Sequence, residues 1–148
     1  MLKIIVTLLA YLISIITLAQ NTNENYSNED RLYSISATVN NVISDSGSVK
    51  FALYDSEDGF KQRKPIKAVS SKIKNGITTV NFEGLVSKTY AILCYHDVND
   101  NGKMDFQNNG MPLEDYGATN NVMNFGPPKY SNAKFELKDK DLTFEIKF

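Results

Sequence analysis

The stretch "TYAILCYH", which runs from Thr89 to His96, decides the fold class of this chain. Its apolar side chains follow one another directly instead of alternating with polar ones, and none of its eight residues is acidic or basic apart from the closing histidine. A short apolar run of this kind is typical of a strand that is covered on both faces. We therefore predict a central strand here, with the rest of the domain packed around it.

The neighbouring stretches alternate with the two-residue period of half-buried strands. In "LYSISATVN" (32–40) one face carries apolar side chains and the other carries Ser34, Ser36 and Thr38; the apolar set is Tyr33, Ile35, Ala37 and Val39. The same alternation recurs in "SVKFALYD" (48–55) and "LTFEIKF" (142–148), and "AKFEL" (133–137) reads as a shorter strand.

"IKAVSSKIKNGITTVNF" (66–82) contains Asn75-Gly76, a dipeptide that favours a tight β-hairpin turn because both residues tolerate positive φ. No convincing helical period is present after the N-terminal segment. About seven strands separated by turn signals predict an all-β domain, an antiparallel β-sandwich of immunoglobulin-like or transthyretin-like type with one long ordered loop.

The N-terminus predicts export. Lys3 precedes an uncharged, mostly apolar run from Ile4 to Ala19, and Thr17 and Ala19 are the small residues that a signal peptidase reads. An uncleaved anchor is the alternative, but the run is short of the ~20 residues that cross a bilayer comfortably. We expect a signal peptide at 1–19, a disordered polar lead at 20–31 and a single β-sandwich domain at 32–148. The mature protein would be periplasmic, cell-surface or secreted, with no transmembrane segment left after cleavage.

Charge and cysteine content narrow the possible functions. The formal net charge of −1 lacks the basic excess of a nucleic-acid-binding protein. Residues 61–74 are locally basic, but no aromatic side chains are interleaved with these charges, so we interpret them as a solvated surface. Cys94 is the only cysteine and can form no internal disulfide. We expect it to be a small apolar core residue.

The connection from Asp97 to Tyr130 is unusually long. Loops beyond ~12–15 residues without structure of their own are uncommon and are often functional. This one contains four glycines and enough apolar residues to pack onto the domain: Met104, Phe106, Met111, Leu113, Tyr116, Val122, Met123 and Phe125. We therefore predict an ordered loop that folds back on the sandwich.

The start of this loop has the oxygen spacing of a calcium-binding loop. Counted from Asp97, side-chain oxygens fall at positions 1, 3, 5 and 9, with a glycine at position 6, and the residues concerned are Asp97, Asn99, Asn101, Asp105 and Gly102. Such spacing aims alternate side chains at one hard cation. Lys103 would contribute its backbone carbonyl. Calcium is therefore the predicted cofactor.

The pattern departs from a helical EF-hand. Asn108 stands at position 12, where an EF-hand has a bidentate glutamate, and no helices flank the loop. Glu114 or Asp115 would have to supply the missing carboxylate, and we take Glu114 as the better candidate. An Asx-rich turn without a cation is the alternative, because Asp, Asn and Gly also cluster in ordinary tight turns.

His96 is the only histidine and stands next to Asp97. It could be a metal ligand or a general base. Adjacent residues on a strand point to opposite faces, however, so these two side chains are badly placed to pair. No serine stands in a nucleophile-elbow sequence, and no phosphate-binding glycine loop is present. We expect His96 to be a structural residue at the edge of the binding surface.

Several stretches, in order, resemble the bacterial family called domain of unknown function 2141. They are "FALYDSEDGF" (51–60), "YAILCYHDVNDNGKMD" (90–105), "GMPLEDYGATNN" (110–121) and "GPPKYSNAKFEL" (126–137). The resemblance covers about Ser48 to Phe148. Lys88 and Thr119 depart from it, since glycine and serine are common at those positions. It implies a small exported β-sandwich protein and does not imply an activity.

The resemblance also singles out a second cluster beside the predicted calcium loop. Pro112 restricts the backbone, Tyr116 offers a ring with a polar tip, and Asn120 offers an amide. They could brace the loop or, with His96, form a surface for a glycan, a peptide or another envelope component. We therefore expect an exported, non-enzymatic module whose calcium loop orders a binding surface, with no catalytic residues. A small metal-dependent or His-assisted hydrolase using His96, Asp97 and Glu114 is the alternative.

Overall fold

The computed structural model describes residues 31–122 and 126–148. The predicted signal peptide, all of the predicted polar lead except Arg31, and the loop residues Met123 and Phe125 lie outside this part of the chain. Within the described residues, no helix has the length and apolar character needed to cross a bilayer.

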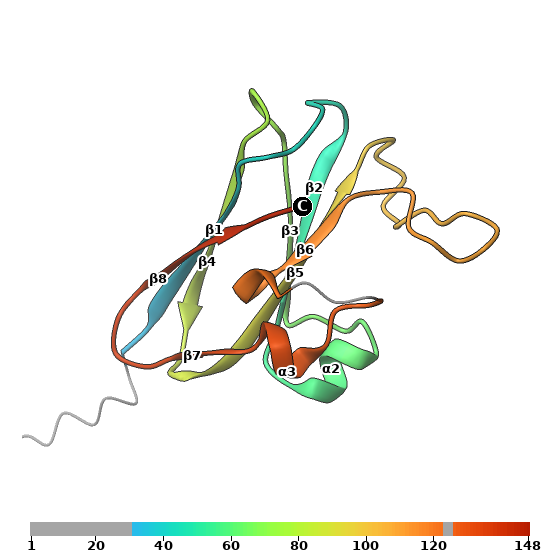
Figure 1. Ribbon diagram of the computed structural model, residues 1–148. Helices are drawn as coiled ribbons and strands as arrows, with labels where there is room; N and C mark the ends of the chain where they lie inside the picture. Colours follow the sequence, from blue (N-terminus) through green and yellow to red (C-terminus); the bar gives the residue numbers. More distant parts are fainter. Residues whose placement is uncertain (1–30, 123–125) are drawn as a thin grey trace, which may run out of the picture.

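Two packed sheets form an all-β sandwich, as predicted (Figure 1). The elements in chain order are β1 (Tyr33–Val39), β2 (Ser48–Tyr54), α2 (Glu57–Lys61), β3 (Lys67–Ser71), β4 (Thr78–Leu85), β5 (Lys88–Asp97), β6 (Tyr116–Ala118), η2 (Thr119–Asn121), α3 (Tyr130–Ala133), β7 (Phe135–Leu137) and β8 (Leu142–Ile146). The smaller sheet has the strand order β4-β1-β8. The larger has the order β3-β2-β5-β6, and β7 pairs with the beginning of β5. All pairs are antiparallel except β1 with β8, which is parallel.

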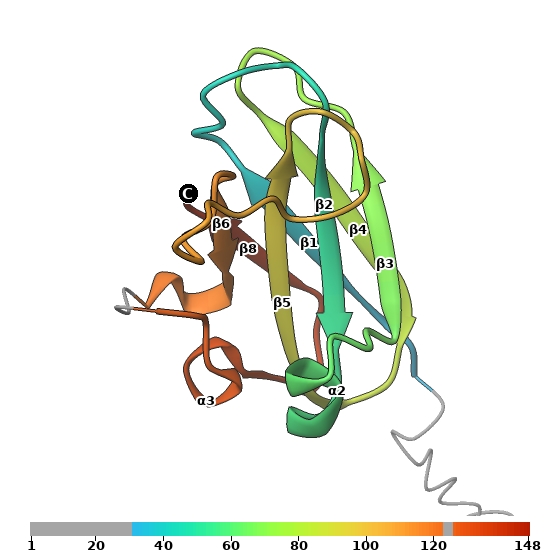
Figure 2. The ribbon, with the colours of Figure 1, turned by 90° about the vertical axis from the view of Figure 1, so that its right-hand side faces the viewer.

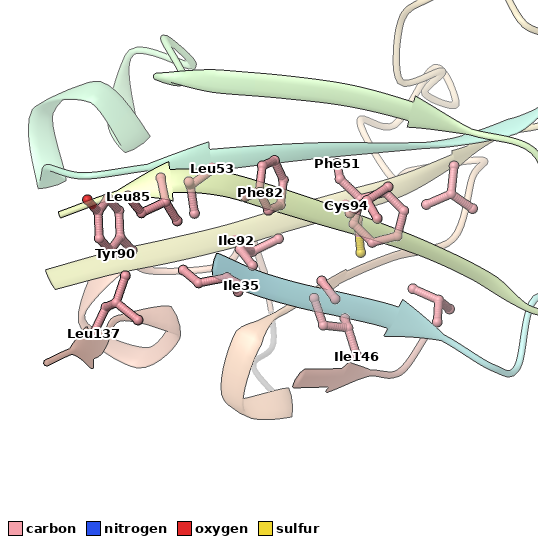
Figure 3. Close-up of a cluster of buried hydrophobic side chains, with 14 of the residues drawn as sticks. Ile35, Phe51, Leu53, Phe82, Leu85, Tyr90, Ile92, Cys94, Leu137 and Ile146 are labelled. Carbon is pink, nitrogen blue, oxygen red and sulfur yellow. The ribbon is translucent and has the colours of Figure 1, made fainter. Parts of the chain in front are cut away.

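The core lies between the sheets and is built by the predicted alternation. Along β1 every odd-numbered residue from Tyr33 to Val39 is buried and every even-numbered one is half-exposed. Phe51 and Leu53 of β2 and Ile92 and Cys94 of β5 point into the same space (Figure 3). A two-residue period therefore delivers one continuous apolar layer.

Strand β5 is covered on both faces, as its sequence predicts. Ala91 and Leu93 point away from the main core into a second cluster with Phe60 of α2 and Ala133 of α3. These two short helices lie on the outer face of the larger sheet (Figure 2). The two helices were not predicted, because elements of five and four residues are too short to show a helical period.

The Asn75-Gly76 turn is present, with φ of 54° and 74° and a bridge between Lys74 and Ile77. The strands on either side are not paired with each other, however. β3 belongs to the larger sheet and β4 to the smaller one, so the turn carries the chain from one sheet to the other. The side chain of Asp45 accepts hydrogen bonds from both turn amides at 2.8 Å and fixes this corner.

The long connection after β5 is more structured than a single loop, since it includes β6 and η2. Its first half projects from the end of the larger sheet at which β5 ends (Figures 1 and 2). Only part of its apolar surface packs onto the domain. Phe106, Met111 and Leu113 are each more than half exposed.

Close packing joins β6 to the other sheet. A methyl group added at Gly117 would lie 2.6 Å from Cγ2 of Ile146 and 2.6 Å from the carbonyl oxygen of Lys147. Asn121 then donates to the carbonyl of Glu145 at 2.8 Å and accepts from the amide of Lys147 at 2.9 Å, as a strand neighbour would. The side chain of one asparagine thus takes up part of the free edge of β8.

Candidate cation site in the loop after β5

Asp97 ends β5 and anchors the loop. Its side chain points to the outer face of the sheet, yet the residue is fully buried because the loop folds over it. Oδ1 accepts from the amide of Asn101 at 3.0 Å, and Oδ2 accepts from the amide of Gly102 at 2.8 Å. The positive φ of 78° at Gly102 allows the chain to turn around this carboxylate.

The alternate polar residues of the loop turn inward. Oδ1 of Asn99 accepts from the amide of Asn101 at 3.1 Å, and Oδ1 of Asn101 accepts from the amide of Lys103 at 2.8 Å. Their side-chain amide groups both donate to Oδ2 of Asp105, at 2.8 and 2.9 Å. Asn99, Asn101 and Asp105, predicted as ligands from their spacing, are therefore brought together.

Glu114 closes the loop from its far end. Oε1 accepts from the amide of Val98 at 3.1 Å, and Oε2 accepts from the amide of Asp105 at 3.2 Å. The residue is 93% buried. Glu114, the carboxylate predicted to replace the one missing at Asn108, thus lies against both the beginning and the ninth position of the loop. Both of its oxygens accept hydrogen bonds from backbone amides.

The negative charges of this region act on one phenol. Burial raises the pKa of Tyr95, and the charges of Asp97, Glu114 and Asp105 raise it further. Tyr95 lies on the same face of β5 as Asp97, two residues before it, so the three carboxylates surround the end of that face. A cluster of carboxylates of this kind attracts a cation.

Two lysines offset part of the negative charge of these carboxylates and of Asp100. Nζ of Lys50 lies 3.4 Å from Oδ2 of Asp97 and 3.6 Å from Oδ1 of Asp100. Nζ of Lys72 donates to Oδ2 of Asp100 at 2.7 Å, and the hydroxyl of Ser48 donates to Oδ1 at 2.5 Å. These contacts bind the loop to β2 and to the end of β3.

Asp100 accordingly serves as the attachment of the loop to the sheet. Its hydrogen bonds to Lys72 and Ser48, with the charges of Lys72 and Lys50, lower its pKa to about 2. It occupies position 4 of the loop, where its side chain points away from the inward-facing oxygens and towards the ammonium groups of Lys72 and Lys50. The four residues of this attachment were not identified from the sequence, because the pairing of Ser48, Lys50 and Lys72 with the loop depends on the sheet register.

The arrangement offers several oxygens to a hard cation. Each asparagine Oδ1 accepts one hydrogen bond and keeps a second lone pair, and the carbonyl of Lys103 accepts none within the described residues. Among the residues described, no three side chains of Asp, Glu, His or Cys lie close enough together to hold a metal ion by themselves. A cation here would therefore depend on amide and carbonyl oxygens as well as carboxylates.

His96 points the other way, into the space between the sheets, and is 99% buried. Nε2 donates to the carbonyl of Ser46 at 2.8 Å, while Nδ1 is buried without a hydrogen-bond partner. His96, Asp97 and Glu114 therefore do not form a catalytic group in this structure. Cys94, two residues earlier on the same face, is also buried, and burial raises the pKa of its thiol.

The residues of the second predicted cluster do not lie together: Pro112 is in the projecting loop, whereas Tyr116 and Asn120 are in β6 and η2. Pro112 pairs with Phe106 in a short bridge near the tip of the loop, and Tyr116 lies half-buried on β6. Asn120 adopts a φ of 70° and donates to the carbonyls of Asn132 and Lys134 at 2.9 and 3.0 Å. Asn120 thus connects η2 to the C-terminal end of α3, and the binding role of this cluster stays a prediction.

Comparison with known protein families matches residues 37–145 to a family described as "Uncharacterized protein conserved in bacteria (DUF2141)". No curated protein and no solved structure matches the chain. The match spans more than half of the 148 residues and includes the loop, both short helices and all the strands at least in part. The chain therefore belongs to the DUF2141 family.

Proposed function

We propose that this protein is an exported, non-enzymatic β-sandwich module whose loop after β5 binds calcium. Binding would order the projecting half of the long connection and present it to an envelope component, a glycan or a peptide. The observation that carries the proposal is the buried carboxylate of Asp97, around which the loop wraps while Asp105 and Glu114 approach from its other end.

The chemistry of the donors favours calcium over softer metals. Carboxylate, amide and carbonyl oxygens suit a hard cation, whereas zinc would require nitrogen or sulfur ligands. His96 and Cys94 point into the core and are unavailable to this loop. Magnesium requires near-ideal octahedral geometry and gives up its water reluctantly, so an oxygen-lined loop without that geometry favours calcium.

The charges support a modest affinity. Asp97, Asp105 and Glu114 carry three negative charges, and Lys50 offsets part of this total. The hydrogen bonds from Asn99 and Asn101 to Asp105 would have to rearrange so that oxygens face the ion. Both effects weaken binding, which suits surroundings rich in calcium.

Thermal melting in EDTA, in calcium and in magnesium tests the proposal. If the dissociation constant is on the order of 10 μM, ~1 mM calcium adds about 2.7 kcal/mol to the free energy of unfolding by mass action. For a domain of this size the melting temperature should then rise by roughly 10 °C. Magnesium should raise it much less. Identical curves in all three solutions would reject the proposal and leave an Asx-rich turn.

Export rests on the N-terminal sequence. Lys3 and the apolar run that ends at Ala19 support cleavage before Gln20. Intact-mass measurement on protein isolated from the native envelope should show a chain that begins at or near Gln20. A mass that includes Met1 to Ala19 would contradict cleavage.

The non-enzymatic part of the proposal can be tested against the hydrolase alternative. Ester, phosphate and glycoside substrates should be hydrolysed no faster with the protein, or with its His96→Ala variant, than in buffer alone. Turnover that the substitution abolishes would favour the hydrolase.

A further inference from the structure

The two short helices α2 and α3 lie at the opposite end of the molecule from the loop after β5 (Figure 2). A cavity lies between α2 and the segment that leads into α3. Its volume is about 430 Å³, which is within the range of sites that hold small ligands. Phe60, Arg63, Lys129 and Tyr130 are among the residues that line it. This cavity plays no part in the proposed calcium function.

The aromatic residues Phe60 and Tyr130 line the cavity, and Tyr54 packs against Phe60 outside the lining. Phe60 lies edge to face with Tyr54 at a centroid distance of 5.1 Å and with Tyr130 at 5.6 Å. Phe60 and Tyr54 are buried, and Ala91 and Leu93 of β5 pack in the same cluster. The rings are therefore fixed to the central strand and give the cavity a rigid base.

Arg63 occupies a position where glycine is usual. α2 ends at Lys61, and the amide of Lys64 donates to the carbonyl of Gly59 at 2.8 Å while the amide of Arg63 donates to that of Phe60 at 3.3 Å. These two bonds make a Schellman ending, whose left-handed residue is commonly glycine because a β-carbon is unfavourable there. Arg63 has a φ of 57°, so an arginine stands at that residue despite its conformational cost.

The guanidinium of Arg63 is held over the rings. Its Cζ lies 5.8 Å from the centroid of Phe60. Burial raises the pKa of Tyr54, and the charge and hydrogen bond of Arg63 act in the opposite direction, so the phenol is a second partner of the guanidinium. Both contacts restrict the side chain, and a restricted guanidinium presents its N–H groups in a defined geometry.

The charge of this cavity is positive. Lys61 is neutralised by Glu57 at 2.7 Å, one turn earlier on α2. Within the described residues, neither Arg63 nor Lys129 has a carboxylate oxygen within 4 Å of its side-chain nitrogens. Two uncompensated cations thus border one cavity in a protein whose formal net charge is −1.

We propose that this cavity binds a compact oxyanion, the carboxylate or phosphate group of a ligand, through the guanidinium of Arg63 with Lys129 beside it. A guanidinium accepts such a group with two parallel hydrogen bonds. The ring of Tyr130 is half-buried and extends the base beyond the cation for the apolar part of the same ligand. The unfavourable backbone of Arg63 is explained by this role, since glycine would end the helix at a lower cost.

The test is an amide NMR titration of the ¹⁵N-labelled protein with sodium phosphate and, separately, with sodium acetate, each against sodium chloride at matched ionic strength. The expected result is saturable shifts at the amides of residues 60–64 and 129–131 with at least one of the two anions. The two titrations distinguish a phosphate ligand from a carboxylate ligand. Shifts that fail to saturate with both anions, or that sodium chloride reproduces, would overturn the proposal.

Three variants make the test specific to Arg63. Arg63→Gly should keep or raise the melting temperature, because glycine suits the left-handed position, and should weaken anion binding at least tenfold. Arg63→Lys keeps the charge without the planar fork and should weaken binding several-fold. Lys64→Gln removes a neighbouring charge outside the cavity and should leave the affinity within twofold. Equal loss in Lys64→Gln and Arg63→Gly, or full affinity in Arg63→Gly, would overturn the proposal.

Discussion

The ammonium group of Lys50 on β2 lies 3.4 Å from the buried carboxylate of Asp97 on β5. The two residues are diagonal neighbours on the outer face of the larger sheet, since Lys50 is directly opposite Tyr95. A buried carboxylate without a partner is costly, so this lysine stabilises the loop when no calcium is bound. The same charge would oppose a divalent cation.

Replacing Lys50 by methionine should therefore have two opposite effects. In EDTA the free energy of unfolding should fall by about 2–4 kcal/mol, because Asp97 loses its counter-charge. Calcium affinity should rise by roughly tenfold, because the repulsion is removed. Urea denaturation in EDTA and a calcium titration of the same variant measure the two quantities. A loss of calcium affinity in this variant would show that Lys50 does not oppose the ion.

Asp97 and Asp100 should respond differently to substitution. Asp97→Ala should abolish the rise in melting temperature on adding calcium, because the central carboxylate of the loop is lost. Asp100→Ala should keep most of that rise, because its side chain binds Ser48 and Lys72 instead of facing the inward oxygens. Melting curves with and without calcium for both variants decide this. Equal loss in both would indicate that calcium binding depends on the attachment of the loop to the sheet.

The attachment of Asp100 should weaken in acid. Its pKa in the folded protein is about 2, below the ordinary value of 3.8, so its contribution to stability is complete above pH 3.8 and is lost as the pH falls towards 2. Urea midpoints at pH 5 and at pH 2.5 should therefore differ less for Asp100→Asn than for the unmodified chain. The same pH dependence in both proteins would mean that other carboxylates account for it.

Gly117 should tolerate no side chain. Alanine there would bring a methyl group to 2.6 Å from two atoms of the strand segment at Ile146 and Lys147, and one of them is a backbone oxygen. We expect Gly117→Ala to cost about 1–3 kcal/mol of stability, as overpacked cores do. Gly110→Ala is the matched control, because a methyl group there meets nothing and only the φ of 81° is unfavourable. Urea denaturation compares them, and a smaller loss at Gly117 than at Gly110 would contradict the proposed close packing.

His96 should matter for stability and not for the cation. His96→Gln should lower the free energy of unfolding by about 1–3 kcal/mol, because a buried ring and its hydrogen bond to Ser46 are disturbed. Calcium affinity should change by less than threefold, since the side chain faces the core. Denaturation and calcium titration of one sample give both values. A large loss of affinity at unchanged stability would place His96 in the site.

The predictions that succeeded rest on local patterns. Alternation in β1 and the doubly apolar run of β5 identify the core faces, because burial repeats with the geometry of the strand. The loop spacing brought Asn99, Asn101 and Asp105 together because Asx side chains direct the backbone over two or three residues. Glu114 lies against this loop through the amides of Val98 and Asp105, but its role as a calcium ligand stays a prediction.

What the sequence did not reveal depends on distant partners. The Asn75-Gly76 turn gives no indication that its two strands enter different sheets, because turn chemistry fixes the bend and not the pairing. Lys50 and Lys72 are ordinary surface lysines until the sheet register places them beside the loop. Arg63 is likewise unremarkable in sequence, and only the ending of α2 reveals its unusual backbone.

The parallel pairing of β1 with β8 has a consequence for how the chain reaches its native state. Ile35 lies opposite Leu142, so one edge of the first strand stays unpaired until the last strand arrives. Contacts of such large sequence separation carry a high loop-closure entropy and slow folding. The domain therefore cannot complete its smaller sheet from its N-terminal half alone.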